Sequence, residues 1–331
     1  MKQHLLSILA KTDRFTNGII ICVILGLLLP CHGIGADIFD WLTNAAIILL
    51  FFLYGAKLSR QSVIDGLLHW RLQALVAFFT FIFFPIFFSL VQPLGERLVG
   101  SALYMGLIYV ACLPSTVQSS IAFTSVAGGN VPAAVCAASA SSLLGVFLTP
   151  LLVGLLFHTS NASGAAVGLD TILQICYQIL LPFIAGQIAQ RWLKPWVDSH
   201  RKLIGWNDQT TIWLVVYTAF SGATRGGYWS QLDARHLIGL ILLCLILLCI
   251  IHATTYFSSK LLGFSREDRI TIVFCGSKKS LAVGAPMMMA IFGSLDNNLL
   301  LPLMIFHQVQ LVTCAHLARM WHRDGDDDGG Y

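Results

Sequence analysis

Long apolar runs recur along most of the chain and constrain its fold more than any other feature. Of its 331 residues, 56% are hydrophobic and 11% are charged, whereas soluble domains contain about 25% charged residues. Uninterrupted apolar runs of about 18–25 residues have the length of membrane-spanning helices. Backbone groups inside a bilayer must find hydrogen-bond partners within the protein, which a helix provides. The sequence therefore predicts an all-α integral membrane protein.

The apolar runs predict ten membrane-spanning helices. Their expected ranges are 15–31, 38–56, 69–92, 101–126, 131–158, 168–190, 209–223, 236–257, 268–292 and 297–320. Of the 20 Lys and Arg residues, Lys278 and Lys279 lie within a span, Arg97, Arg225 and Arg235 fall on the predicted outer side, and the remaining 15 lie on the inner side. Because cytoplasmic loops are enriched in positive charge, this distribution predicts that both termini are cytoplasmic.

Composition and residue spacing disfavour several other classes of protein. The net charge of +4 is small and follows the membrane topology, so no nucleic-acid partner is expected. The nine cysteines include no C-x-x-C pair and are interpreted as small buried apolar residues, with no metal site. Gly18–Pro30 imitates a signal peptide but is interpreted as the first span, because no clear cleavage site follows it. The spans contain no nucleophile–base constellation, so no enzyme is expected.

The two halves of the chain resemble one another. Leu53–Lys57 at the end of the second span is similar to Phe220–Arg225 at the end of the seventh, and Pro114–Ser120 and Cys275–Ser280 interrupt the fourth and ninth spans. Five spans is an odd number, so two such halves would form an inverted repeat. The alternative is chance similarity of short Gly/Ser segments. We predict one transporter domain over 1–331, with repeats at 1–160 and 165–322 and a solvated tail at 323–331.

Lys278 and Lys279 lie side by side within the apolar stretch Ile270–Phe292. A lysine at the centre of a bilayer costs about 2.5–3.5 kcal/mol even on insertion scales, so a pair of them indicates a functional site. The adjacent Gly276 and Ser277 suggest a helix broken at mid-depth, as transporters use to bind solutes. The alternative is that both side chains extend from a helix end to the headgroup region.

The acidic residues fall in predicted loops, tails and helix ends, so no mid-membrane carboxylate is expected beside the two lysines. Coulomb repulsion in a medium of low dielectric disfavours a cation bound directly next to Lys278. Two explanations stay open. Either a lysine ammonium takes the place of a coupling cation and its proton loss drives the cycle, or the lysines neutralise an anionic solute. No cofactor is expected, and Na⁺ or H⁺ is left open as the coupling ion.

Further polar residues in the predicted spans are candidate solute-binding or ion-binding groups. After the proline that interrupts the fourth span, Gln118, Ser119 and Ser120 supply an amide and two hydroxyl groups. The alternative is helix packing through small residues. His307 and Gln310 add polar groups to the last span. A proton relay is one role for His307, and hydrogen-bonded packing is the other.

Two strings carry a resemblance to a known family: Leu-Phe-Phe-Leu-Tyr-Gly-Ala-Lys-Leu-Ser-Arg at 50–60 and Phe-Cys-Gly-Ser-Lys-Lys-Ser-Leu-Ala at 274–282. Together with 113–154, they resemble the bile acid:sodium symporter family, in particular its orphan seventh-member branch of the solute carrier 10 group. The resemblance covers nearly the whole chain. It implies a panel of helices one, two, six and seven that moves against a core of helices three to five and eight to ten. Broken helices four and nine cross in that core.

The same resemblance implies which residues lie at the crossing. By position these are Ser119 and Ser120 on helix four and Ser277 and Lys278 on helix nine. The sodium-binding symporters have a glutamate where this chain has Val273, and Gln-Asn where it has Ser277 and Lys278. The loss of these groups implies that the fold carries over to this chain and that sodium coupling does not.

Other sodium ligands of the family are also replaced. The helix-three glutamine corresponds to Thr80, and two helix-five hydroxyl ligands correspond to Ala134 and Ala138, with Ser139 adjacent. Of the cation ligands, the serine at Ser119 is plainly retained. The resemblance also implies a multi-pass protein of the bacterial inner membrane.

The expected function is secondary transport of a small organic, anionic solute by alternating access. Lys278 would be the principal charge at the crossing, with Lys279 beside it. The expected partners are the solute and the lipid bilayer. The alternative is a non-transporting membrane sensor or regulator, which the intramembrane lysines lock in one state by mimicking a bound cation.

Overall fold

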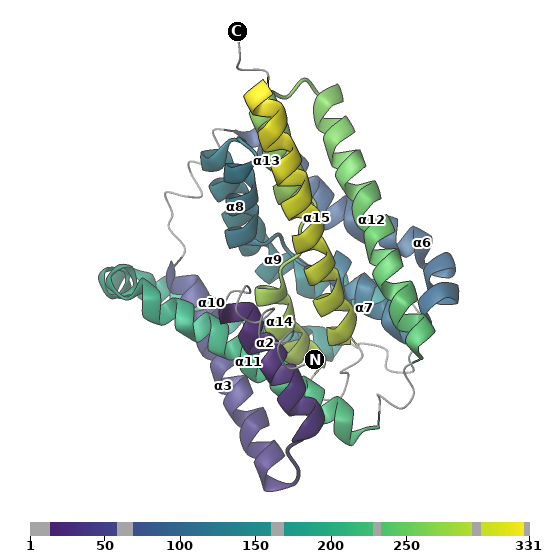
Figure 1. Cartoon of the computed structure of the whole chain (residues 1–331). Helices are drawn as coiled ribbons and strands as arrows, with labels where there is room; N and C mark the ends of the chain where they lie inside the picture. Colours follow the sequence, from purple (N-terminus) through teal and green to yellow (C-terminus); the bar gives the residue numbers. More distant parts are fainter. Residues whose placement is uncertain (1–13, 58–68, 160–168, 228–232, 293–298, 328–331) are drawn as a thin grey trace, which may run out of the picture. The chain divides into compact units, whose positions relative to one another are not determined.

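The computed structural model describes residues 14–57, 69–159, 169–227, 233–292 and 299–327, and these residues are helical almost throughout (Figure 1). No strand occurs among them, which confirms the all-α prediction. Of the described helices, five are long and apolar enough to cross a membrane: Ile34–Lys57, Trp70–Val99, Val131–Phe157, Ala234–Leu261 and Leu300–His322. Helical segments occupy all ten predicted ranges. The count of ten spans and the inverted repeat stay predictions.

The chain forms two compact units, and each unit draws on both halves of the sequence. Of the described residues, the first unit comprises 14–57, 178–227, 285–292 and 299–300, and the second comprises 69–159, 169–177, 233–284 and 301–327. The division between the two compact units therefore does not coincide with the boundary between the predicted repeats at 1–160 and 165–322. Lys2, Lys11 and Arg60, which contribute to the topology prediction, lie outside the described residues.

The first unit contains α2 (Arg14–Leu28), α3 (Ile34–Lys57), most of α10 (Leu169–Ser199) and α11 (Arg201–Arg225). The backbones of α3 and α10 approach closely at two glycines. A Cβ atom on Gly55 would overlap the carbonyl of Phe183, and one on Gly186 would overlap the carbonyl of Phe52. Gln187 Nε2 also donates to the Gly55 carbonyl at 2.5 Å. Small residues allow this approach between membrane helices.

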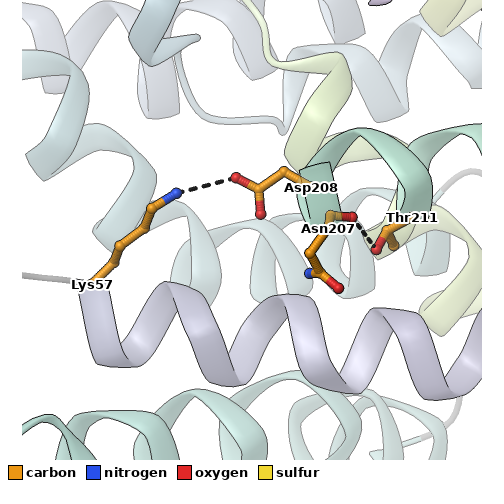
Figure 2. A network of polar contacts seen from close by, with 4 residues as sticks. All are labelled: Lys57, Asn207, Asp208 and Thr211. Atoms are coloured by element: carbon orange, nitrogen blue, oxygen red, sulfur yellow. Dashed lines mark hydrogen bonds and ion pairs between the residues drawn. The ribbon is translucent and has the colours of Figure 1, made fainter. Parts of the chain in front are cut away.

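Helix α11 begins at Arg201 instead of at residue 209, where the hydropathy pattern predicts it. Asp208 therefore lies inside a helix, which corrects the expectation that acidic residues fall only in loops, tails and helix ends. Its Oδ2 atom is 3.1 Å from Lys57 Nζ at the end of α3 (Figure 2). One turn along, Thr211 Oγ1 donates to the Asn207 carbonyl at 2.8 Å. The polar first turns of α11 lower its hydropathy, which is why the sequence pattern misses them.

The second unit holds the other helices, except that α14 (Leu281–Phe292) belongs to the first unit from Ala285 onward. They are α5 (Trp70–Phe78), the π-helix η1 (Phe79–Phe83), α6 (Phe84–Val99), α7 (Ser101–Ala111), α8 (Val117–Val126), α9 (Val131–Thr159), α12 (Ala234–Leu261), α13 (Arg266–Gly276), the start of α14 (Leu281–Phe292) and α15 (Leu300–Asp327). Leu72, Ala134 and Ile272 join α5, α9 and α13 in one apolar core. The last helix continues to Asp327, into the range predicted to be a solvated tail.

Short non-helical segments interrupt two of the predicted spans. Helix α7 ends at Ala111 and α8 begins at Val117, while α13 ends at Gly276 and α14 begins at Leu281. These are the places where the sequence pattern indicates breaks. Pro114 has no amide hydrogen and disfavours helical geometry in the residue before it. At the second break, serine hydroxyls compete with the backbone for hydrogen bonds.

Candidate functional site

The two interrupted helices contact one another within the second unit. The amide of Ser280 donates to the Pro114 carbonyl at 2.9 Å, so the two non-helical segments are joined directly through their backbones. Tyr109 Oη donates to the Gly284 carbonyl at 2.7 Å. Ser120 Oγ donates to the Phe274 carbonyl at 3.2 Å. Irregular backbone is tolerated at membrane depth when protein surrounds it and satisfies its polar groups, as these contacts do.

The carbonyl groups at the end of α7 receive hydrogen bonds from side chains. A helix terminus leaves its last carbonyl groups without partners in the helix. Lys279 Nζ donates to the carbonyls of Ala111 and Leu113, each at 2.8 Å. Thr149 Oγ1 donates to the Cys112 carbonyl between them, also at 2.8 Å. The break after α7 is thus held by an ammonium from the break after α13 and by a hydroxyl from α9.

Lys279 is completely buried, and its ammonium uses all three of its N–H donors. Besides the carbonyls of Ala111 and Leu113, it donates to the carbonyl of Thr80 at 2.7 Å. Its Nζ atom lies 4.1 Å from the centre of the Phe84 ring. The resemblance implied a role for Thr80 through its side chain, whereas the structure uses its main-chain oxygen. The Thr80 hydroxyl is buried without a hydrogen-bond partner among the described residues.

The carbonyl of Thr80 is available because of the helix around it. In η1 the amide of Phe84 bonds to the carbonyl of Phe79, five residues back. In an α-helix that amide would bond to Thr80 instead. The next residue is Pro85, which has no N–H to donate. The π-helix and the proline together expose one backbone oxygen for the ammonium of Lys279.

Lys278 is also completely buried, but its surroundings differ from those of Lys279. Its Nζ atom donates to Ser119 Oγ at 2.7 Å and lies 4.1 Å from the centre of the Phe123 ring. Ser119 Oγ in turn donates to Thr116 Oγ1 at 2.9 Å. Ser119 is the one hydrogen-bond acceptor of this ammonium among the residues that the structure describes. Two of its three N–H groups therefore remain available for a ligand.

Neither buried ammonium has an acidic partner in the described part of the chain. The ion pair found there joins Lys57 and Asp208, which belong to the first unit. The described residues also contain no group of three or more His, Cys, Asp or Glu side chains that could hold a metal ion. The charge available to a ligand beside the interrupted helices is therefore positive.

Gln310 holds the second break in place. Its Oε1 atom accepts from the amide of Lys279 at 2.8 Å, and its Nε2 atom donates to the carbonyl of the same residue at 2.9 Å. His307, one turn earlier on α15, is buried with its Nδ1 atom 3.3 Å from Gln310 Nε2. Both residues were candidates for solute or ion binding. Gln310 instead bonds to the backbone of Lys279, and His307 contacts Gln310.

The other candidate residues are less closely associated with the two ammonium groups. Ser277 Oγ donates to the Val273 carbonyl of its own helix at 2.5 Å. Gln118 is exposed in the first turn of α8. Ser139 is half-buried on α9. The structure thus brings Ser119, Ser120, Thr80 and Gln310 to the lysines or to the contacts between the breaks. It gives Gln118 and Ser139 no hydrogen bond to either lysine.

Two hydroxyl groups on α9 support the first break and were missed in the sequence. Ser141 Oγ accepts from the amide of Ser115 at 2.9 Å, and Thr149 bonds to Cys112 as described above. Ser141 lies in a run of small residues that is typical of helix packing. The composition of this run therefore did not indicate that Ser141 contacts the first break. The pairing depends on which residues of α9 face the break.

Comparison with known proteins places the chain in a family. The SBF-like CPA transporter family matches residues 13–323, which include both breaks and both lysines. The chain belongs to the SBF-like CPA transporter family. It is similar to an uncharacterized protein of Pseudomonas aeruginosa, with 51% identity over 316 residues that cover 95% of this chain and 94% of the relative.

Two further relatives carry names that describe transport. "Putative symporter YfeH" of Escherichia coli (strain K12) is 48% identical over 315 residues, covering 94% of this chain and 93% of the relative. "Sodium/bile acid cotransporter 7-B" of Xenopus laevis is 31% identical over 312 residues, covering 91% and 89%. These matches confirm the resemblance to the bile acid:sodium symporters. As a member of the SBF-like CPA transporter family, the protein is a multi-pass membrane protein of a type that handles small-molecule substrates.

Proposed function

We propose that the protein is a secondary active transporter that moves a small organic anion by alternating access, with Lys278 as the charge that binds the solute. The observation that carries this proposal is the environment of the Lys278 ammonium. It is completely buried, has Ser119 Oγ as its hydrogen-bond acceptor, and has no carboxylate partner among the described residues. A buried charge without a counter-charge is costly. An anionic solute would supply that counter-charge.

The helix that carries Ser119 adds to the positive potential. Helix α8 begins at Val117, so Ser119 lies in its first turn. The first turn of a helix has free N–H groups and a partial positive charge, which favour anions. Broken helices whose N-termini face an anionic group are a recurring solution in secondary transporters. A carboxylate or a similar oxyanion therefore suits this position better than a cation.

We infer that the two compact units correspond to the moving panel and the core of an alternating-access transporter. The first unit contains α2, α3, α11, most of α10 and the end of α14, and the second contains α5 to α9, α12, α13, α15 and the start of α14. Apart from the end of α14, this division supports the assignment of helices one, two, six and seven to the panel. We further propose that the protein lies in the inner membrane of a bacterium with both termini in the cytoplasm.

We propose that transport does not require sodium. The names of the cotransporter 7 relatives attribute sodium coupling to those proteins. In this chain, buried apolar Val273, Ala134 and Ala138 stand where the resemblance implies cation ligands. The nearby carbonyl groups of Ala111 and Leu113 already accept hydrogen bonds from Lys279.

The test of the proposal begins with purified protein and a library of small organic anions, each added with and without Na⁺. A ligand that stabilises the protein against heat does so through mass action. That anion is then used for uptake into proteoliposomes by the wild type and by Lys278→Ala. We expect the variant to elute as a folded protein, to lose the thermal stabilisation and to lose uptake.

Lys260→Ala is the matched control, because Lys260 is an exposed lysine in the last turn of α12. It is expected to retain uptake. Full uptake by Lys278→Ala would remove the site assignment. The competing proposal, a sensor locked by its lysines, is favoured by the fixed position of the Lys279 ammonium. Anion binding by the wild type without flux of that anion would support the sensor.

A further inference from the structure

The three oxygen atoms around the Lys279 ammonium come from three separate places in the second unit. Thr80 belongs to η1, Ala111 is the last residue of α7, and Leu113 lies in the break that follows. We propose that these main-chain oxygens form a binding site for a monovalent cation, and that the ammonium of Lys279 is its covalently attached occupant. The proposal concerns a different group from the solute-binding Lys278, and it does not depend on transport.

The geometry around Nζ is that of a cation site. The three N···O distances lie between 2.7 and 2.8 Å, and the Phe84 ring faces the nitrogen at 4.1 Å. Main-chain carbonyls replace the hydration shell of K⁺ in selectivity filters, and aromatic faces attract cations. All three ligands are neutral, and no carboxylate pairs with this ammonium among the described residues. Divalent ions are usually bound through one or more carboxylates, so a monovalent cation suits these ligands better.

Two of these oxygens, those of Thr80 and Ala111, lack the backbone amide donor that a continuous α-helix would give them. The Phe84 amide bonds to Phe79 instead of Thr80, and Pro85 has no amide hydrogen. In a continuous helix the Ser115 amide would bond to Ala111, but it donates to Ser141 Oγ at 2.9 Å. The buried oxygens therefore need a donor or a cation from elsewhere, and burying them without one is unfavourable.

The spacing also indicates the size of the cation. Distances of 2.7–2.8 Å are typical of N–H···O hydrogen bonds and are longer than the roughly 2.3–2.6 Å at which Ca²⁺ binds oxygen. The site should accept ammonium, a short alkylammonium or K⁺ once the lysine side chain is removed. In the wild type the attached ammonium excludes them.

The experiment measures thermal unfolding of purified Lys279→Ala in the chloride salts of ammonium, n-propylammonium, potassium and choline at equal ionic strength. n-Propylammonium reproduces the three carbons and the nitrogen that the substitution removes. We expect ammonium and n-propylammonium to raise the melting temperature of the variant by about 3–6 °C relative to choline, through mass action. The wild type is expected to melt at the same temperature in all four salts.

Two variants control for effects of salt and of lost volume. Lys278→Ala removes the other buried ammonium, which bonds to a hydroxyl, and should melt equally in ammonium and choline. Lys279→Met fills the cavity without a charge, so it should melt below the wild type and should not respond to ammonium. Equal melting of Lys279→Ala in ammonium and choline would overturn the proposal. So would an equal response of Lys278→Ala.

Recovery of folded protein by size-exclusion chromatography is recorded in each salt, in case Lys279→Ala is too unstable in choline to melt. Recovery in ammonium or n-propylammonium but not in choline supports the proposal. Equal recovery in all salts without a difference in melting temperature, or no recovery in any of them, contradicts it, because a vacated cation site should be filled by the added cation.

Discussion

Lys278 and Lys279 are adjacent in the sequence, but their side chains contact different parts of the second unit. Lys278 reaches Ser119 and the Phe123 ring on α8, whereas Lys279 reaches η1 and the end of α7. Consecutive residues outside a helix can direct their side chains apart in this way. On the proposals above, loss of the first ammonium removes ligand binding, and loss of the second weakens the contact between the breaks.

A prediction at the residue scale concerns Gln310, whose amide bonds to both backbone groups of Lys279. Gln310→Leu would leave a buried N–H and a buried C=O without these partners, at about 1–3 kcal/mol each. We expect a lower melting temperature in detergent for this variant. The control is Gln308→Leu, two residues earlier on the same helix, where the side chain is exposed. Equal melting of the two variants would contradict the assigned role.

At the scale of elements, each irregular segment presents backbone groups to another segment. The π-helix η1 presents the Thr80 oxygen, and the breaks after α7 and α13 bond to one another through Pro114 and Ser280. Because these contacts join segments far apart in the sequence, a change in one segment alters the fit of the others. The same dependence on close backbone approach holds for α3 and α10 in the first unit.

Gly186→Ala tests that approach. The added Cβ atom would overlap the Phe52 carbonyl on α3, so the helices must separate. We expect a loss of about 1–3 kcal/mol in stability, as for other overpacked sites, measured as a lower melting temperature. Gly205→Ala on α11 is the control, because a Cβ atom there meets nothing within 4 Å. Alanine favours helix over glycine by up to about 1 kcal/mol, so the control should melt at or above the wild type.

At the scale of the whole molecule, the positive charges predict its orientation in the membrane. A fusion of green fluorescent protein to the C-terminus should fluoresce, because that end is expected in the cytoplasm. A fusion of alkaline phosphatase after Gly227, which follows α11, should be active, because that loop is expected outside. Phosphatase activity at the C-terminus, or its absence after Gly227, would contradict the predicted topology.

Ion coupling is also a property of the whole transport cycle. If the Lys279 ammonium fills a cation site permanently, uptake of the identified anion should proceed at a similar rate when external Na⁺ is replaced by K⁺ or choline. Initial uptake rates in proteoliposomes measure this directly. A strict requirement for Na⁺ with saturation kinetics would show that a sodium site exists elsewhere in the chain.

Features that depend on local chemistry could be predicted from the sequence. Apolar runs indicated helices because a bilayer leaves the backbone no alternative. Pro114 and the Gly276–Ser277 pair indicated the two breaks, which the helix boundaries match. Two lysines in an apolar segment identified the candidate site, and the strings around them identified the family, which the comparisons confirm. Local hydropathy misjudged the start of α11, because its first turns are polar.

The contacts of each lysine depend on the packing of distant segments and could not be predicted from the sequence. Hydropathy and spacing treat Lys278 and Lys279 alike, because both occupy the same non-helical segment. Their partners are a hydroxyl on α8 for one and three backbone oxygens from distant segments for the other. A backbone oxygen has no sequence signature, since every residue has one. Helix register and packing determine which backbone oxygens have no amide donor in their own helix and lie beside an ammonium.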